Sequence, residues 1–240
     1  MPPLQAVTFD FWNTLIRAGD AGKVELRLVV FGDVLAGAGF DVAPDAIADA
    51  MAAAVGRFDE RWKANQHYDA AAAVTDMVAR LGLPVDDATR GGLIAAIEDP
   101  DPSLVPRPAP NVGDALEALR SAGVRIGIVC DVGLTPSATL RRYLERNGLL
   151  GYFDHWSFSD EVGAYKPDPM IFDHALAGLG GVTPGRAAHV GDLRRTDIGG
   201  ARARGLFTVR YTGIADDPGD PADGTDRVEG DAVVADHADL

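Results

Sequence analysis

The sequence predicts an α/β protein with a Rossmann-like, doubly wound parallel sheet as its core and an α-helical cap inserted after the first strand. Short apolar runs typical of buried strands alternate with amphipathic helical patterns along most of the chain. Residues 17–106 interrupt this alternation, because they contain no clear strand pattern. Polar residues suited to chemistry follow the ends of several apolar runs, where ligands bind in sheets of this kind.

The first strand is predicted within residues 4–12, an apolar segment rich in β-forming residues that carries Asp10 near its end. Other apolar runs predict the remaining strands, at residues 124–130, 187–190 and 206–211, with a short edge strand at 232–234. Helical patterns lie between them, at residues 111–121, 137–147 and 169–179. Strands that alternate with helices form parallel βαβ units, which gives the doubly wound sheet.

Residues 17–106 are expected to form four helices. In one of them apolar side chains recur every three or four residues, at Ile47, Met51, Val55, Phe58 and Trp62. This stripe predicts packing within a helical bundle. We therefore expect residues 1–16 and 107–240 to form the core and residues 17–106 to form a cap that closes over the strand ends.

The charge balance restricts the partners of the protein. Of 240 residues, 36 are acidic and 22 are basic, which gives a formal net charge of -14. A negative field repels phosphate backbones and anionic lipid surfaces, so no binding to nucleic acid or membranes is expected. A small anionic substrate is compatible if the site supplies a local cation. No pattern in the sequence indicates an oligomeric state.

The compartment is predicted from cysteine content and from the N-terminus. Cys130 is the one cysteine, so an intrachain disulfide is excluded and a reducing compartment is favoured. The N-terminus lacks the pattern of a signal peptide, and no apolar run is long enough to span a membrane. A cytoplasmic location is therefore expected.

Four clusters of residues suited to chemistry fall at predicted strand ends or in the loops after them. They are Asp10, Trp12 and Thr14 in FDFWNTL, Cys130 and Asp131 in IVCDVG, Lys166 in GAYKPDP, and Asp192 and Asp197 in GDLRRTD. Loops at the carboxyl edge of a parallel sheet converge in one crevice. Carboxylates and an ammonium group gathered there suit a hard divalent cation and an anionic group, so Mg²⁺ is the predicted cofactor.

The order and spacing of FDxxxTL, KPDP and GDxxxxD resemble the haloacid dehalogenase (HAD) superfamily, in its branch with a helical cap after the first motif. The resemblance extends over nearly the whole chain. It implies that Asp10 is a nucleophile that forms an aspartyl-phosphate and that Thr14 binds substrate in the same loop. It also implies that Lys166 orients the nucleophile and neutralises phosphoryl charge. Asp192 is implied as a magnesium ligand and Asp197 as a supporting carboxylate, and Asp10, Asp192 and Asp197 are all candidate metal ligands.

The sequence departs from the phosphatases of this superfamily in two motifs. Trp12 stands where they usually have a second aspartate, a general acid and base of the kind worth about 100- to 10,000-fold in rate. The main-chain carbonyl of Trp12 is still able to ligate the metal. Cys130 stands where a serine or threonine usually donates to the phosphoryl group, and a thiol is a weak donor. Asp131 adds negative charge beside it. All three are expected to line the substrate site.

Two alternatives to a magnesium-dependent phosphatase of a small phosphorylated metabolite stay open. Haloacid dehalogenases proper also lack the second aspartate and commonly have an aromatic residue there, as at Trp12. They work without metal, however, and usually replace the residue that corresponds to Asp192, so the retained Asp192 favours phosphoryl chemistry. The other alternative is a catalytically impaired relative that binds a metabolite without turnover.

Three further polar features have no predicted role in the reaction. His189, next to the end of a predicted strand, is expected to be packed or hydrogen-bonded rather than catalytic. Arg194 and Arg195 are expected to be solvated. The acidic segment 216–226, interspersed with proline and glycine, is predicted to be a solvated loop.

Overall fold

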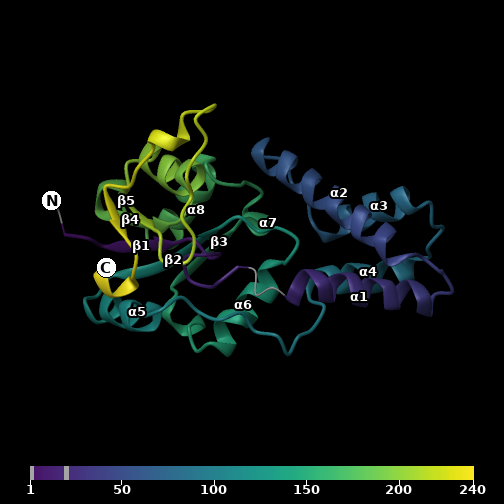
Figure 1. The fold of residues 1–240 in the computed structure, drawn as a ribbon. Helices are drawn as coiled ribbons and strands as arrows, with labels where there is room; N and C mark the ends of the chain where they lie inside the picture. The colour runs from purple at the N-terminus through teal and green to yellow at the C-terminus, as the bar shows by residue number, and fades with distance from the viewer. Residues whose placement is uncertain (1–2, 19–21) are drawn as a thin grey trace. The chain divides into compact units, whose positions relative to one another are not determined.

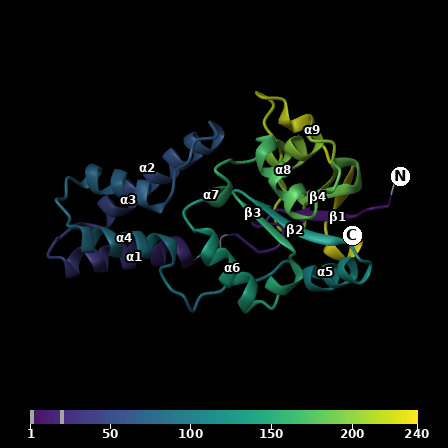
Figure 2. The same ribbon diagram turned by 180° about the vertical axis from the view of Figure 1, so that it is seen from behind.

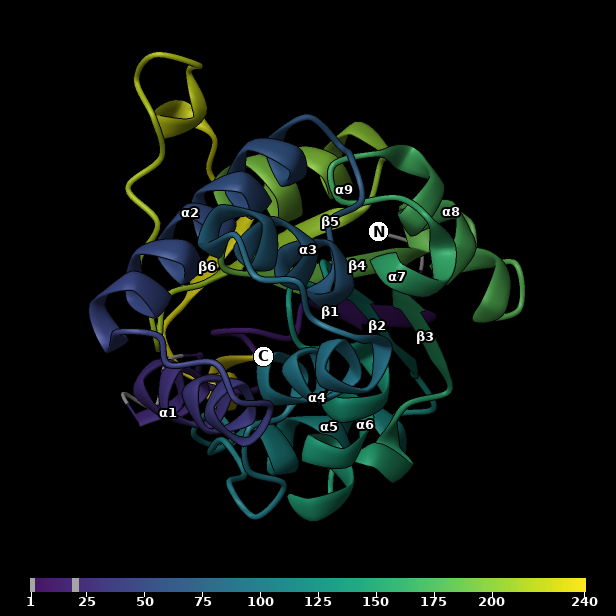
Figure 3. The ribbon, with the colours of Figure 1, turned by 90° about the vertical axis from the view of Figure 1, so that its right-hand side faces the viewer.

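The structure of the protein, a computed structural model, describes residues 3–18 and 22–240. Six parallel strands form one sheet in the order β3-β2-β1-β4-β5-β6 (Figure 3). The strands are β1 (Ala6–Phe9), β2 (Arg125–Cys130), β3 (His155–Phe158), β4 (Ala187–Gly191), β5 (Phe207–Tyr211) and β6 (Ala232–Val234). The predicted doubly wound α/β core is confirmed, because strand order reverses direction at β1.

The central strand β1 delivers Asp10 to the carboxyl edge of the sheet. All four residues of β1 are buried, as expected for a strand covered on both faces. Phe9, its last residue, is in register with Ile128 of β2 and Val190 of β4. The Asp10 N–H then donates to the Val190 carbonyl at 2.8 Å. Asp10 and Asp192 therefore leave neighbouring strands at the same edge.

Helices cover both faces of the sheet. Figure 3 shows α5 (Val112–Ser121) on one face and α8 (Pro169–Gly178) with α9 (Gly200–Ala203) on the other. The apolar side of α8 packs on the sheet through buried Ile171, Phe172 and Leu176. Outside the region predicted as a bundle, the other elements are α6 (Ser137–Arg146), α7 (Ser159–Val162), the 3₁₀ turns η1 (Leu150–Tyr152), η2 (Pro184–Arg186), η4 (Thr225–Arg227) and η5 (His237–Asp239), and the π-helical turn η3 (Arg194–Gly199).

The described part of the region predicted as a bundle contains four helices, α1 (Gly22–Gly37), α2 (Pro44–Lys63), α3 (Ala70–Leu81) and α4 (Asp87–Glu98). Their ends have local causes: the Asp69 carboxylate accepts from the Ala72 N–H at the start of α3, and Gly82 ends α3 in the left-handed conformation. Phe31, Met77, Leu93 and Ile97 are fully buried in their shared core. Within residues 3–18 and 22–240, no helix combines the length and apolar character needed to cross a membrane.

The buried face of α2 differs from the predicted stripe. Val55 was expected in the core but is 50% exposed, whereas Ala50 and Ala54 are buried beside Ile47 and Met51. The spacing 47, 50, 51 and 54 still follows helical periodicity. The small alanine side chains let α3 pack closely against α2, so this face is selected over one that includes Val55.

The chain divides into two compact units (Figure 1). The core unit comprises Met1–Ala18, Pro106–Asp131 and Tyr143–Leu240, and the helical unit comprises Gly19–Val105 and Val132–Arg142. Figure 2 shows the helices α1–α4 of the helical unit from behind. The division differs from the predicted boundaries at 132–142, the loop after β2 and the first part of α6. There Arg27 donates to Thr135 Oγ1 at 2.8 Å, which ties this loop to α1.

Several elements of the core unit were not predicted, and β3 and η3 are two of them. The edge strand β3 has the sequence HWSF, and only Ser157 and Phe158 of its four residues are buried. A strand this short and polar has no clear period-2 pattern. The π-helical turn η3 was not predicted, because its extra residue per turn leaves no mark in the sequence.

The acidic segment 216–226 was predicted to be a solvated loop, and this is wrong for Asp217, which is half-buried, whereas the Asp216 side chain is 69% exposed. Arg194 donates from its main-chain N–H to Asp217 Oδ2 at 2.7 Å and from Nε to the Asp217 carbonyl at 2.7 Å. Arg210 pairs with Asp216 at 2.5 Å. The Arg194 side chain is only 12% exposed, so its predicted solvation is also wrong. These pairs form because a guanidinium group has several donors that match carboxylate and carbonyl oxygens.

Candidate active site

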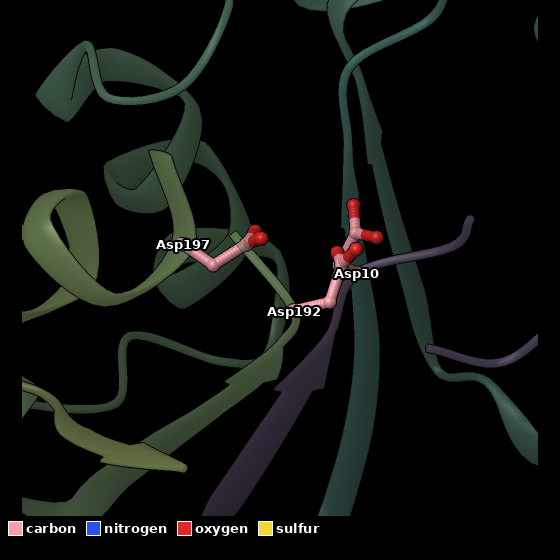
Figure 4. Close-up of side chains that lie close together, drawn as sticks. All are labelled: Asp10, Asp192 and Asp197. Carbon is pink, nitrogen blue, oxygen red and sulfur yellow. The ribbon is translucent and has the colours of Figure 1, made fainter. Parts of the chain in front are cut away.

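Three carboxylates and one ammonium group meet at the carboxyl edge of the sheet. Lys166 Nζ lies 2.5 Å from Asp10 Oδ1 and 2.6 Å from Asp197 Oδ1. Oxygens of Asp10, Asp192 and Asp197 lie within 4.8 Å of one another. Figure 4 shows the carboxylates of Asp10 and Asp192 side by side, with that of Asp197 directed toward them. All four side chains are buried, so their charges act on one another with little screening.

Lys166 is the cation of this cluster and is 2% exposed. Burial alone lowers the pKa of its ammonium group, but attraction to Asp10 and Asp197 outweighs burial and holds the pKa well above its usual value. Lys166 therefore stays charged. It serves as a fixed positive charge and hydrogen-bond donor, and it is unsuited to exchanging protons during a reaction.

Asp10 and Asp192 lie where burial and neighbouring negative charges disfavour their ionised forms. Burial raises the pKa of Asp10 to about 7, although Lys166 opposes the increase. Burial, with the neighbouring charges of Asp10 and Asp197, raises the pKa of Asp192 to about 8. A divalent cation would remove this cost. An all-oxygen set of buried carboxylates is the chemistry that Mg²⁺ prefers, so the residues present fit this ion.

Asp197 differs from the other two carboxylates because donors surround it. Its Oδ1 accepts from Lys166 and from His189 Nε2 at 3.1 Å, and its Oδ2 accepts from the Leu193 N–H at 2.9 Å. Burial raises the pKa of Asp197, but Lys166 and His189 more than compensate and lower it to about 2. Asp197 thus remains ionised and anchors Lys166.

A buried polar chain supports Asp197 from within the sheet. Thr8 of β1 and His189 of β4 are in register, and Thr8 Oγ1 lies 2.9 Å from His189 Nδ1. Burial lowers the pKa of His189, which favours the neutral ring. Because Asp197 only accepts, His189 Nε2 bears the proton and Nδ1 accepts from the Thr8 hydroxyl. The prediction that His189 is hydrogen-bonded is confirmed, but its link to the site was missed. The signal was present, since AVTF and AAHV each place a polar residue inside a buried strand.

Gly191 allows Asp197 to approach the end of β4. A Cβ atom at position 191 would lie 2.3 Å from Asp197 Cγ, far inside van der Waals contact. Glycine is therefore required by the close approach of side chain to backbone, and not by an unusual backbone angle.

The loop after Asp10 is a tight turn that contains Trp12 and Thr14. The N–H groups of Leu15 and Ile16 both donate to the Phe11 carbonyl at 3.0 Å. Trp12 packs edge-on against Phe11 and Tyr143, with ring centroids 5.0 and 6.4 Å apart. Thr14 is fully buried, and within the described residues its hydroxyl has no hydrogen-bond partner. A hydroxyl left unpaired in this way is available to a bound group.

The second motif lies at the end of β2, with Cys130 as the last residue of the strand and Asp131 directly after it. Cys130 is fully buried, and burial, followed by the charge of Asp10, holds the pKa of its thiol well above the usual value, so it is no nucleophile. The Asp131 carboxylate accepts from the Lys166 main-chain N–H at 2.8 Å. Asp131 therefore positions Lys166, a role that the sequence did not indicate. Contact of Cys130 and Asp131 with substrate stays a prediction.

Comparisons with a family model and with curated proteins point to the same family. The model of the haloacid dehalogenase-like hydrolases matches residues 4–205. The glyceraldehyde 3-phosphate phosphatase of Methanopyrus kandleri is 27% identical over 209 residues, which are 86% of this chain and 83% of that protein. The ribulose-1,5-bisphosphate 5-phosphatase of Halopiger xanaduensis is 37% identical over 131 residues, 54% of this chain and 51% of that protein.

Solved structures establish the same fold. A HAD phosphatase from Thermococcus onnurineus has a TM-score of 0.67 at 24% identity, with 99% of this chain and 96% of that chain covered. A 2-haloacid dehalogenase from Pseudomonas syringae pv. Tomato has a TM-score of 0.66 at 21% identity, with the same coverage. Since a phosphatase and a dehalogenase are equally similar in shape, the choice between the two reactions depends on the site residues.

The substitution Gly191→Ala is expected to push Asp197 away from β4 and so to loosen its hold on Lys166. Overpacking of this kind costs about 1–3 kcal/mol of unfolding free energy, measured by denaturant titration. Gly151→Ala is the matched control, because a Cβ there meets nothing within 4 Å. Equal stabilities for the two variants would contradict the packing argument.

In protein freed of metal by EDTA, Asp192→Asn is expected to be stabilising, and increasingly so as the pH rises from about 4 to about 8. The pKa of Asp192 in the folded state is above the ordinary 3.8, so the folded state binds more protons than the unfolded state over this range. The free energy of unfolding therefore falls with rising pH, by about 1.4 kcal/mol for each unit of pKa difference at most. Asparagine cannot ionise and escapes this loss.

Urea titrations of both proteins across this pH range measure the difference, with Asp114→Asn on the exposed start of α5 as the control. If the difference in unfolding free energy between Asp192→Asn and the parent is constant with pH, ionisation of Asp192 does not destabilise the folded protein.

Proposed function

The chain belongs to the haloacid dehalogenase-like hydrolase family, and on that premise we propose that it is a magnesium-dependent phosphatase of a small phosphorylated metabolite. The observation that supports this most is the buried cluster in which Lys166 holds Asp10 while Asp192 lies within 4.8 Å. The relatives named above as phosphatases, one of them aligned over most of its length, support the same reaction class.

Asp10, Asp192 and the main-chain carbonyl of Trp12 would hold the Mg²⁺ ion. When bound, the ion neutralises charge on the carboxylates and on a phosphoryl group. Asp197 was also predicted as a ligand. Its oxygens already accept from Lys166, His189 and the Leu193 N–H, so we assign it the supporting role that the family resemblance implies.

In the proposed reaction a carboxylate oxygen of Asp10 attacks phosphorus. Lys166 occupies Oδ1, which leaves Oδ2 as the attacking atom. The new O–P bond forms as the bond from phosphorus to the leaving oxygen breaks. Water then attacks phosphorus, releases inorganic phosphate and regenerates Asp10. Throughout, Lys166 stabilises negative charge on the transferring group, and the Thr14 hydroxyl is free to donate to it.

The proposed enzyme is selective for good leaving groups. Trp12 packs against aromatic rings and offers no titratable proton, so the leaving oxygen must take its proton from water. Acyl and aryl phosphates depart readily as anions, whereas alkoxides of alkyl phosphates need a proton as they leave. We therefore expect activated phosphates to be the preferred class.

Dehalogenation of a 2-haloacid is the second candidate, and Trp12 is the observation that favours it, because halide leaves without a proton. Asp192 opposes it, since a third buried carboxylate without a cation would repel the carboxylate of a haloacid. Halide release that persists in EDTA would support this candidate. Binding of phosphate mimics without turnover of any substrate would instead support the impaired metabolite-binding relative.

The substitution Asp10→Asn is expected to reduce phosphate release from acetyl phosphate and 4-nitrophenyl phosphate by at least about 1,000-fold, because it removes the attacking carboxylate. EDTA should abolish the activity of the parent protein, and added Mg²⁺ should restore it. Asp114→Asn is the control and should retain full activity. Undiminished phosphate release by Asp10→Asn would overturn the proposed function.

The substitution Trp12→Asp is expected to raise kcat on an alkyl phosphate such as glycerol phosphate by about 100-fold or more, because it restores a proton donor. Trp12→Asn is the matched control, since it has the same size as aspartate but no titratable proton. The argument about the missing acid fails if the two variants show the same kcat on the alkyl phosphate.

A further inference from the structure

Residues 212–240, at the end of the chain, contact the loops of the site. They follow the part of the sequence that the family model matches. The family model ends its match at residue 205. Figure 1 shows this part of the chain in yellow, with its last turn beside α5. We call residues 212–240 the C-terminal strap.

The strap reaches the loop after Asp10 through His237. His237 Nε2 lies 2.8 Å from the Thr14 carbonyl oxygen, and the histidine is 1% exposed. Because a carbonyl only accepts, Nε2 bears the proton and donates it to this bond. The bond joins residues 223 positions apart and restrains the peptide group between Thr14 and Leu15.

His237 is itself held by contacts that do not involve the site. Its ring stacks on Tyr211 of β5, with centroids 4.3 Å apart and planes at 17°. The Asp236 carboxylate accepts from the Ala238 N–H at 2.9 Å and from Asn111 Nδ2 at 2.7 and 2.9 Å. The imidazole is therefore fixed by β5 and by the start of α5. It therefore presents its N–H to the Thr14 carbonyl from a fixed position, beside the main-chain bonds within the loop.

The other end of the strap holds the second loop of the site. Asp217 accepts from the Arg194 main-chain N–H, and the Arg194 side chain returns a bond to the Asp217 carbonyl, both at 2.7 Å. Arg194 begins the turn η3, two residues after Asp192 and three before Asp197. The strap thus bonds both of the loops that supply carboxylates to the cluster.

We propose that His237 is a positioning residue, which acts through the Thr14 carbonyl to hold the loop from Asp10 to Ile16 in the geometry needed for the reaction. The catalytic part of this proposal rests on the proposed phosphatase function. The part that concerns ordering of the loop is independent of that function, because it applies to the protein without substrate or metal. A purely structural role would instead act through the stacking of the ring on Tyr211.

Two substitutions separate these roles. His237→Phe keeps an aromatic ring against Tyr211 but removes the donor to Thr14. His237→Gln loses the ring but keeps an N–H donor at a similar reach. His155→Phe is the control for the change of residue type, because His155 lies in β3 at the other end of the sheet order.

The first measurement is hydrogen exchange of metal-free protein over residues 11–16. His237→Phe is expected to speed exchange of the Leu15 and Ile16 amides about ten-fold or more, with His237→Gln close to the parent. The second is kinetics with 4-nitrophenyl phosphate and Mg²⁺. His237→Phe is expected to lower kcat about ten-fold with KM nearly unchanged, and His237→Gln to restore kcat even though its Tm falls.

The proposal is overturned if His237→Phe exchanges and turns over like the parent, or if both variants lose kcat only in proportion to their loss of Tm. If the parent protein hydrolyses no phosphate, the proposed function fails. The exchange measurement still decides in that case whether the strap orders the loop.

Discussion

The ammonium group of Lys166 sits between Asp10 and Asp197, and the rest of the site depends on this double ion pair. Three carboxylates in a buried crevice would repel one another strongly, and a single lysine cannot balance them all. Asp197 receives the most donors and stays ionised. The uncompensated charge is left on Asp10 and Asp192, whose pKa values are raised. Repulsion between these buried carboxylates therefore destabilises the site, and a bound cation would relieve it.

The fold meets the demands of this cluster in several places. Neighbouring central strands deliver Asp10 and Asp192 to the same edge, so no long side chain has to reach across the sheet. Thr8 and His189 anchor Asp197 from inside the sheet, and Asp131 fixes the main chain of Lys166. Each contact restrains a charged side chain whose neighbours would otherwise push it away. Such restraint keeps the attacking oxygen in place and lowers the reorganisation that reaction requires.

The sequence predicts the parts of this arrangement that local patterns determine. Apolar runs and the polar residues after them locate five of the strands and place Asp10, Lys166, Asp192 and Asp197 at one edge. The sequence predicts poorly those features of the structure that depend on packing between distant parts of the chain. The edge strand β3 is too short and polar to stand out, and α2 turns its alanines inward because α3 packs there. The bond from His237 to Thr14 ends on a main-chain carbonyl, which any residue has, so no pattern marks it.

The account depends on the claim that the Asp10 and Asp192 carboxylates, whose negative charge Lys166 does not fully balance, form a cation site. Titration calorimetry of metal-free protein with MgCl₂ near neutral pH tests this claim most directly. The account predicts one Mg²⁺ ion bound per chain with release of protons, because raised pKa values leave these carboxyl groups partly protonated without the metal. It also predicts that binding is lost in Asp192→Asn. Absence of binding at millimolar Mg²⁺, or equal binding by Asp192→Asn, would contradict it.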